Sequence, residues 1–242
     1  MCRKLFFIIF LCVLPMVAAN AESTPTPSVT VRVKSKKIKP IELNQIVFPA
    51  PPPFLTRSRV RRVVGRVESF LEWDIRKVRV LWYASAEEFS KSSGLGFEAL
   101  AYTRPNENII HIGPKVDDKN FDIVLGHELT HVVLYQKYKD AVPKWLEEGL
   151  ANYVAKKKSV DWSLLKGKTL PDITSLVHPG DGRNLPAMHY AASTAAMQMI
   201  ASRCRVQDLL QLSVGKKLET YLSTFCRIKE INSEFKKWVE KH

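Results

Sequence analysis

Two histidines four residues apart, with a glutamate directly after the first, are the side chains whose types and spacing best suit chemistry in this sequence. They are His127, Glu128 and His131, in the stretch FDIVLGHELTHVVLYQ. Residues four apart lie above one another on the same face of an α-helix, so both imidazoles can reach one ion. In the H-E-x-x-H pattern the histidines bind zinc, and the glutamate acts as a base rather than as a ligand. The pattern therefore predicts a helical Zn2+ site with Glu128 as general base.

The residues around the motif are apolar on almost every side of the expected helix. They are Ile123, Val124, Leu125, Leu129, Val132, Val133 and Leu134. A helix that is hydrophobic all round is buried, and burying His, Glu and His together without partners is strongly unfavourable. A metal ion, with hydrogen bonds behind its ligands, compensates for that burial. The alternative is a pair of hydrogen-bonded core histidines, which must also explain the buried glutamate.

A third protein ligand is expected in the stretch VPKWLEEGLANYV, which offers Glu147 and Glu148. Only one of two adjacent helical residues can point squarely at the metal. We favour Glu148, because Ala151 and Asn152 lie on the same stripe of the helix. Gly149 beside it leaves room for close packing of another helix.

Together, HELTH and the PKWLEEGLANY that follows it resemble the peptidase MA-like zinc metallopeptidases. These are a branch of the glutamate-ligand zincins, related to thermolysin and to the aminopeptidases with a W-L-x-E-G motif. By this resemblance His127, His131 and Glu148 are the zinc ligands. The similarity is sharp over residues 121–154, looser over residues 78–113, and one of character only in the carboxyl-terminal helices.

The resemblance implies metal-assisted hydrolysis of an amide bond, in which Glu128 takes a proton from water and returns it to the leaving amine. The tetrahedral oxyanion needs a donor, and the stretch AMHYAAS offers Tyr190 and its neighbour His189. We favour Tyr190, which resembles the tyrosine that opens the family's helix after the E-G segment, with a purely structural aromatic as the alternative. Thermolysin-like enzymes carry an aspartate four residues after the third ligand, where this chain has Asn152. An amide oxygen can accept the same hydrogen bond, but without charge.

The strand ENIIHIG, residues 107–113, is expected to border the cleft. In this class of zincins an edge strand before the motif helix pairs with extended substrate, and backbone pairing needs no particular side chain. His111 within the strand could also serve as a ligand, but an exposed or hydrogen-bonded strand histidine is the favoured interpretation.

Strand patterns precede helical ones along the chain. KVRVLWYAS and ENIIHIG are typical of strands, and between them lies a short helix that Ser85 caps and Gly94 ends. From Arg57 the apolar residues follow a helical period, on a face that comprises Val60, Val63, Val64, Val67 and Phe70. The order of elements, a few strands first and then helices without β–α alternation, predicts an α+β fold. We expect a zincin-like catalytic domain with a small N-terminal sheet and a mostly helical C-terminal part.

Three segments are expected along the chain. Residues 1–21 combine a basic start, an apolar stretch and an A-x-A site, which is typical of a cleavable secretory signal. Residues 22–57 are rich in Pro, Thr and Lys and suit a tether, within which VTVRVKSKKI could add an edge strand. Residues 58–242 then form the metallopeptidase domain.

Charge and cysteine content bear on location and partners. Cys204 and Cys226 suit a disulfide in an oxidising compartment, with two free thiols as the alternative. The net charge of +13 favours contact with an anionic cell-envelope surface, and export makes nucleic acid the least expected partner.

The leading hypothesis is an exported zinc-dependent peptidase, periplasmic or secreted, that acts on peptide or protein substrates. The first alternative is a zinc-binding but non-hydrolytic module for binding or assembly in the cell envelope. The second is a surface-binding protein in which the zinc is structural. The sequence leaves open the substrate, endo- or exo-cleavage, and the oligomeric state.

Overall fold

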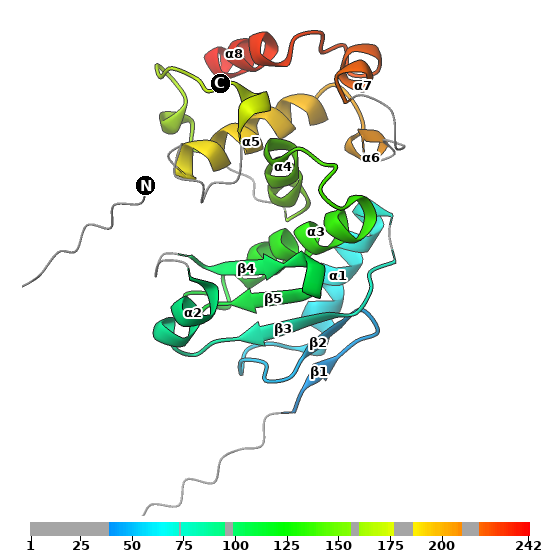
Figure 1. Ribbon diagram of the computed structural model, residues 1–242, viewed down its shortest axis with the longest axis vertical. Coiled ribbons are helices and arrows are strands. Elements are labelled where there is room, and N and C mark those ends of the chain that lie inside the picture. The colour runs from blue at the N-terminus through cyan, green and yellow to red at the C-terminus, as the bar shows by residue number, and fades with distance from the viewer. Residues whose placement is uncertain (1–38, 73, 95–98, 156–159, 177–185, 210–217) are drawn as a thin grey trace, which may run out of the picture. The chain divides into compact units, whose positions relative to one another are not determined.

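A five-stranded mixed sheet forms the amino-terminal side of the described fold (Figure 1). The computed structural model describes residues 39–72, 74–94, 99–155, 160–176, 186–209 and 218–242. The strands are β1 (Ile41–Glu42), β2 (Ile46–Phe48), β3 (Val78–Trp82), β4 (Ala101–Arg104) and β5 (Ile109–Ile112), in the spatial order β1-β2-β3-β5-β4. The three central strands run parallel, whereas β1 and β4 pair antiparallel at the two edges.

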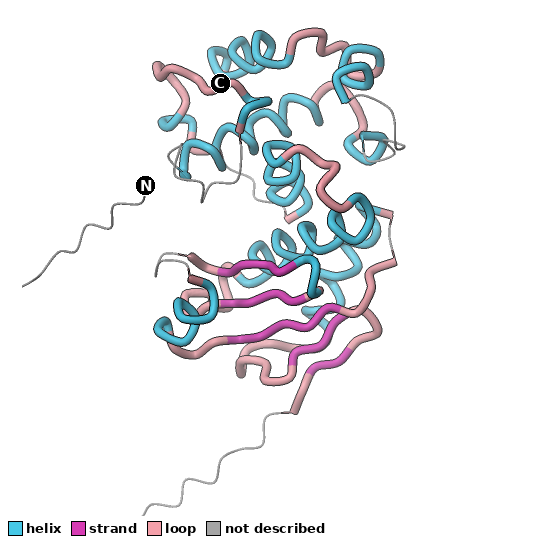
Figure 2. The backbone as a smooth tube through the Cα atoms, viewed as in Figure 1, coloured by secondary structure: helices cyan, strands magenta, loops and turns pink. Residues whose placement is uncertain are grey.

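Helices α1 (Arg57–Leu71) and α3 (Phe121–Tyr138) lie along one face of this sheet (Figure 2). The face is formed by alternate residues of the three central strands, all of which are buried: Ile46, Phe48, Val78, Val80, Ile110 and Ile112. The four valines expected on the apolar face of α1 are buried, and Phe70 is half-buried against Tyr153. Side chains of α1 and α3 therefore form the core beneath the sheet.

The folded unit includes residues 39–56, although their composition predicts a tether. Ile46 and Phe48 are fully buried, and β2 pairs in parallel with β3. Because α1 connects these two strands, the chain contains one β–α–β unit, contrary to the expected absence of alternation. Strands of two and three residues are too short to show a period in the sequence. The predicted signal, residues 1–21, and the run VTVRVKSKKI lie outside the described residues.

The expectation that the ENIIHIG strand forms the edge of the sheet is wrong. This strand is β5, and it lies between β3 and β4. The edge next to α3 is β4, which pairs antiparallel with β5 from Ala101 to Arg104. The 3-10 turn η1 (Pro105–Glu107), followed by Asn108 at a φ of 55°, reverses the chain between the two strands. Because β5 also pairs with β3, the segment before the turn, rather than ENIIHIG, is the outer strand.

Helices form the carboxyl-terminal part, so the predicted α+β class is confirmed. They are α4 (Lys144–Val154), α5 (Pro186–Ala201), α6 (Val206–Leu209), α7 (Leu218–Thr224) and α8 (Ile231–Lys241), with α2 (Ala86–Ser93) beside the sheet and the 3-10 turns η2 (Trp162–Leu164) and η3 (Ile173–Ser175). Helix α5 packs against both α4 and α8 (Figure 1). Among the described helices, none is both long and apolar enough to cross a membrane.

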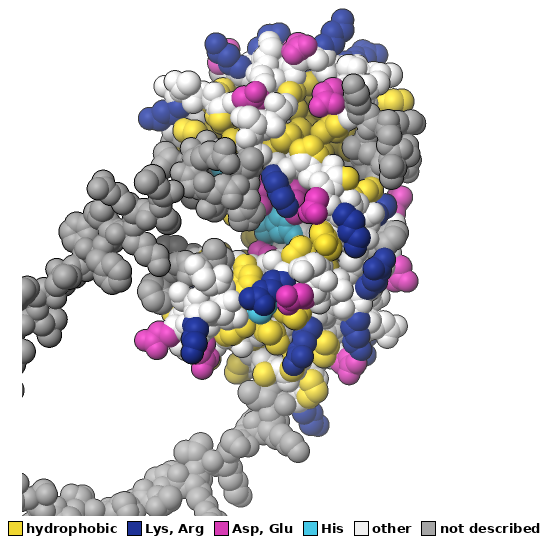
Figure 3. Space-filling view, in the orientation of Figure 1, with side chains coloured by type: hydrophobic (Ala, Val, Ile, Leu, Met, Phe, Trp, Pro, Cys, Tyr) yellow, Lys and Arg dark blue, Asp and Glu magenta, His cyan; other side chains and the backbone are white. Residues whose placement is uncertain are grey.

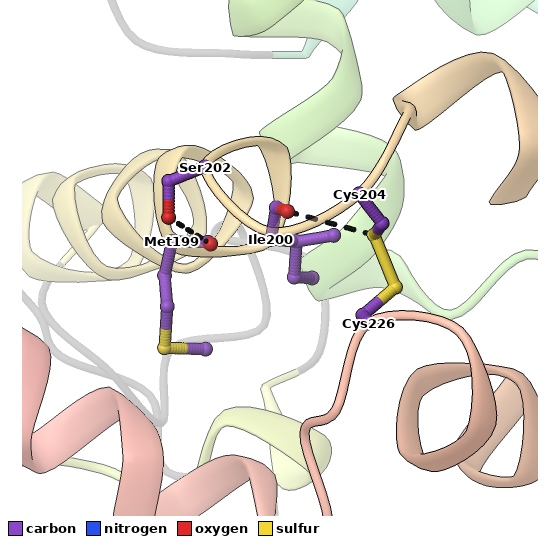
Figure 4. Close-up of a disulfide and its surroundings, with 5 residues drawn as sticks. All are labelled: Met199, Ile200, Ser202, Cys204 and Cys226. Atoms are coloured by element: carbon purple, nitrogen blue, oxygen red, sulfur yellow. Dashed lines mark hydrogen bonds between the residues drawn. A yellow bond between two sulfur atoms is a disulfide. The ribbon is translucent and has the colours of Figure 1, made fainter.

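The helical part contains a close helix–helix approach and a disulfide bond. At Gly149 of α4, a Cβ atom would lie 2.6 Å from the Ser193 carbonyl oxygen of α5, so the glycine permits the close approach of the helices, as expected. The predicted disulfide between Cys204 and Cys226 is present and joins the chain after α5 to the chain after α7 (Figure 4). On the chain-entropy model, closing this loop stabilises the fold by about 3 kcal/mol.

Candidate metal centre

The structure brings His127, His131 and Glu148 together between α3 and α4. The two Nε2 atoms are 3.1 Å apart, and the Glu148 Oε2 atom lies 3.5 Å from Nε2 of His127 and 3.8 Å from Nε2 of His131. A circle through these three atoms has a radius of about 2.0 Å, which is close to the length of a metal bond to imidazole nitrogen or carboxylate oxygen. The group can therefore hold a metal ion with all three residues as ligands.

The outer nitrogens of both histidines are hydrogen-bonded to residues of α4. Nδ1 of His131 lies 2.7 Å from Glu147 Oε1, and Nδ1 of His127 lies 3.1 Å from Asn152 Oδ1. A carboxylate or amide oxygen only accepts, so each Nδ1 atom is the donor. The lone pair of a neutral imidazole then lies on Nε2, which faces the centre of the group. Glu147, the alternative to Glu148 in the sequence, thus contacts the outer nitrogen of His131 and does not belong to the clustered group.

Charge at the group favours a cation. Carboxylates of Glu128, Glu147 and Glu148 surround the histidines, and Lys144 forms an ion pair with Glu147 at 2.7 Å. Burial lowers the pKa of His131, but these carboxylates, Glu148 first, outweigh that effect and raise it to about 9. For Glu147, burial raises the pKa, but the hydrogen bonds and charges of His131 and Lys144 outweigh burial and lower this pKa below its usual range. The arrangement stabilises positive charge between the ligands.

Glu128 lies beside the three clustered residues but is held by a different element. Its carboxylate accepts a hydrogen bond from the Thr103 hydroxyl of β4 at 2.5 Å, and that hydroxyl also lies 3.4 Å from the Glu128 carbonyl oxygen. The side chain is almost fully buried. The edge strand therefore fixes the carboxylate that the motif predicts as general base.

Tyr190, on the first half of α5, lies within the electrostatic reach of the group. Burial raises the pKa of its hydroxyl, and the charges of Glu148 and Glu128 raise it further. The phenol is consequently a hydrogen-bond donor at neutral pH. Its neighbour His189 is buried, with its ring 6.2 Å from the Tyr190 ring.

His111 does not join the group. It stacks between Tyr102 of β4 and Tyr83, which directly follows β3, with ring centroids 4.1 Å and 5.8 Å away, and its Nδ1 lies 2.8 Å from the Tyr83 hydroxyl. Since Ile110 and Ile112 face the buried core beside α3, the intervening histidine points to the other face of the sheet. Burial, followed by the charge of Arg104, lowers its pKa to about 4. The sequence preference for a strand histidine over a ligand agrees with this position.

Two threonines of the site were not found from the sequence. Thr103 bonds to Glu128, and Thr194 of α5 bonds to Asn152. A threonine in a strand or in an apolar helix has no signal that distinguishes a hydrogen-bonding role from packing. Only the contact across the fold reveals these two residues.

One side of the group is open to solvent. The side chains of His127 and His131 are 16% and 13% exposed, whereas Glu148 is only 3% exposed. Figure 3 shows histidine side chains at the surface with acidic and basic side chains beside them. Both imidazoles are therefore partly accessible to solvent. No protein-family model matches this chain, and no curated protein matches it.

Proposed function

We propose that this protein is an exported zinc-dependent peptidase of the glutamate-ligand zincin type. The observation that carries the proposal is the compact group of His127, His131 and Glu148, with Glu128 beside it. Two imidazoles and one carboxylate, with a fourth position open to solvent, are the ligand set and the geometry of catalytic zinc. The expected ligand distances of about 2.0–2.2 Å fit the spacing of the three atoms.

Zinc held by these residues would lower the pKa of water and polarise a carbonyl group. Glu128, held by Thr103, is placed to accept the proton of the attacking water. The oxygen of that water joins the carbonyl carbon, the carbon–nitrogen bond breaks, and Glu128 returns the proton to the amine nitrogen. Tyr190 donates a hydrogen bond to the oxyanion, and its raised pKa means that the phenol still carries its proton at neutral pH.

Substrate and location are also part of the proposal. Peptide bonds are the substrate class that the resemblance to zincins implies. The signal pattern of residues 1–21 and the Cys204–Cys226 disulfide support export to the periplasm or beyond the cell. Exposed arginines on the outer face of α1, Arg57, Arg61 and Arg62, are suited to an anionic envelope surface.

The test is metal content and hydrolysis measured on the same samples of residues 22–242. We expect one zinc ion per chain by elemental mass spectrometry, and loss of zinc in His131→Ala and Glu148→Ala. Glu128→Gln should retain the metal and the fold but lose cleavage of a peptide library, because the amide cannot accept the proton.

Each alternative has a distinct outcome. A wild-type chain that takes up no offered zinc would refute the metal centre. Zinc uptake without cleavage of any peptide would favour the non-hydrolytic module. Full cleavage by Glu128→Gln would exclude Glu128 as the base.

A further inference from the structure

The amide of Asn152 lies between His127 and Thr194, and its orientation follows from the hydrogen bonds of Thr194. The Thr194 hydroxyl lies 2.6 Å from the Tyr190 carbonyl oxygen, which can only accept, so the single hydroxyl hydrogen points there. The Thr194 oxygen can then only accept from Asn152, whose Nδ2 lies 2.7 Å away. The amide NH2 group therefore faces α5.

This orientation determines which nitrogen of His127 carries hydrogen. With Nδ2 directed to Thr194, the amide oxygen is directed to Nδ1 of His127, at 3.1 Å. Because the amide oxygen accepts the hydrogen bond, Nδ1 must carry the hydrogen. A neutral imidazole has only one N–H group. The lone pair then lies on Nε2, the atom that faces Glu148 and His131.

The two histidines differ in how securely this tautomer is held. His131 faces the Glu147 carboxylate, which accepts in every orientation. His127 faces an amide, which would present an N–H group if it turned over and would then favour hydrogen on Nε2. A metal cannot bind an Nε2 atom that carries hydrogen. His127 consequently needs a further residue that holds the amide in place.

We propose that Thr194 is a positioning residue of the metal centre, which sets the tautomer of His127 through Asn152 and thereby the affinity for zinc. This inference rests on the zinc site of the proposed function and goes beyond it. Asn152 and Thr194 are 2% and 4% exposed, so bulk water does not replace the hydroxyl. The same hydroxyl bonds the Tyr190 carbonyl, so one residue of α5 links a metal ligand to the oxyanion donor.

The test compares Thr194→Val, which keeps the shape and removes the hydroxyl, with Thr194→Ser, which keeps the hydroxyl. Thr130→Val is the matched control, because Thr130 is also buried and, within the part of the chain that the structure describes, its hydroxyl bonds the Gly126 carbonyl of its own helix and no residue of α4 or α5. Zinc dissociation constants are measured by competition with a chromophoric chelator. Thr194→Val should weaken zinc binding about 10-fold, the lower end of the effect of removing a group bonded directly to a ligand, because Thr194 acts through Asn152. Thr194→Ser and Thr130→Val should stay close to wild type.

Two further measurements keep the outcome decisive. Long-range proton–nitrogen NMR of the metal-free chain should show His127 with hydrogen on Nδ1 in wild type and a tautomer mixture in Thr194→Val. In an Asn152→Asp background, where a carboxylate accepts in either orientation, Thr194→Val should have little effect on zinc binding. This second comparison also applies if Thr194→Val alone does not fold.

The results separate this inference from the proposed function. Unchanged zinc affinity in Thr194→Val, or an equal loss in Thr130→Val, would overturn the role of Thr194 while leaving the zinc site intact. A wild-type chain that binds no zinc would refute the proposed function. The NMR comparison would still decide whether Thr194 sets the tautomer.

Discussion

Replacing Gly149 with alanine is expected to destabilise the protein, although alanine favours a helix more than glycine does. The added Cβ atom would lie 2.6 Å from the Ser193 carbonyl oxygen and 2.9 Å from the Met197 Cβ atom. Both neighbours belong to the buried face of α5, and a helical carbonyl cannot rotate away from the contact. Helices α4 and α5 would therefore have to separate by several tenths of an ångström.

The size of the effect follows from two opposing contributions. Overpacking of this kind costs about 1–3 kcal/mol, and the higher helix propensity of alanine returns about 1 kcal/mol. We expect a net loss of up to about 2 kcal/mol in the free energy of unfolding. Since Glu148 precedes Gly149, the same displacement should also weaken zinc binding.

Gly65→Ala is the matched control for this substitution. Gly65 is exposed in the middle of α1, and an added Cβ atom there meets nothing within 4 Å. It should stabilise the chain by about 0.5–1 kcal/mol. Urea unfolding with chelator present measures both variants without a contribution from bound metal. Equal stabilisation by Gly149→Ala would refute the close approach of α4 and α5.

Thr103→Val should leave zinc content unchanged and reduce peptide cleavage, since it frees the Glu128 carboxylate from β4; unchanged cleavage would exclude a role for Thr103. Protonation of His131, with a folded pKa of about 9 against 6.5, stabilises the metal-free chain fully below pH 6.5. That stabilisation is lost as the pH rises through 9, so zinc affinity from chelator competition should increase between pH 6 and 9; a flat profile would contradict the raised pKa. Reducing the Cys204–Cys226 disulfide should lower the free energy of unfolding by about 3 kcal/mol, and an unchanged urea midpoint would contradict this value.

The sequence by itself determined those features that depend on neighbours along the chain. The i, i+4 spacing of His127 and His131 places both imidazoles on one helical face whatever surrounds the helix. The period of the α1 valines and the caps of α2 at Ser85 and Gly94 are equally local, and the structure shows them as expected. The disulfide was predictable because only two cysteines follow the signal pattern.

Only the tertiary structure decided the order of the strands and the hydrogen bonds to the outer nitrogens of His127 and His131. The short strands β1 and β2 form because they pair with neighbouring strands and are partly buried, so the local sequence does not predict them. The adjacent residues Glu147 and Glu148 make different contacts because of the way α4 packs against α3. The Glu147 carboxylate lies next to Nδ1 of His131, whereas the Glu148 carboxylate lies 3.5 and 3.8 Å from the Nε2 atoms of His127 and His131. Thr103 lies 25 residues from Glu128 in the sequence and Thr194 lies 42 residues from Asn152, and they meet because β4 and α5 pack against α3 and α4.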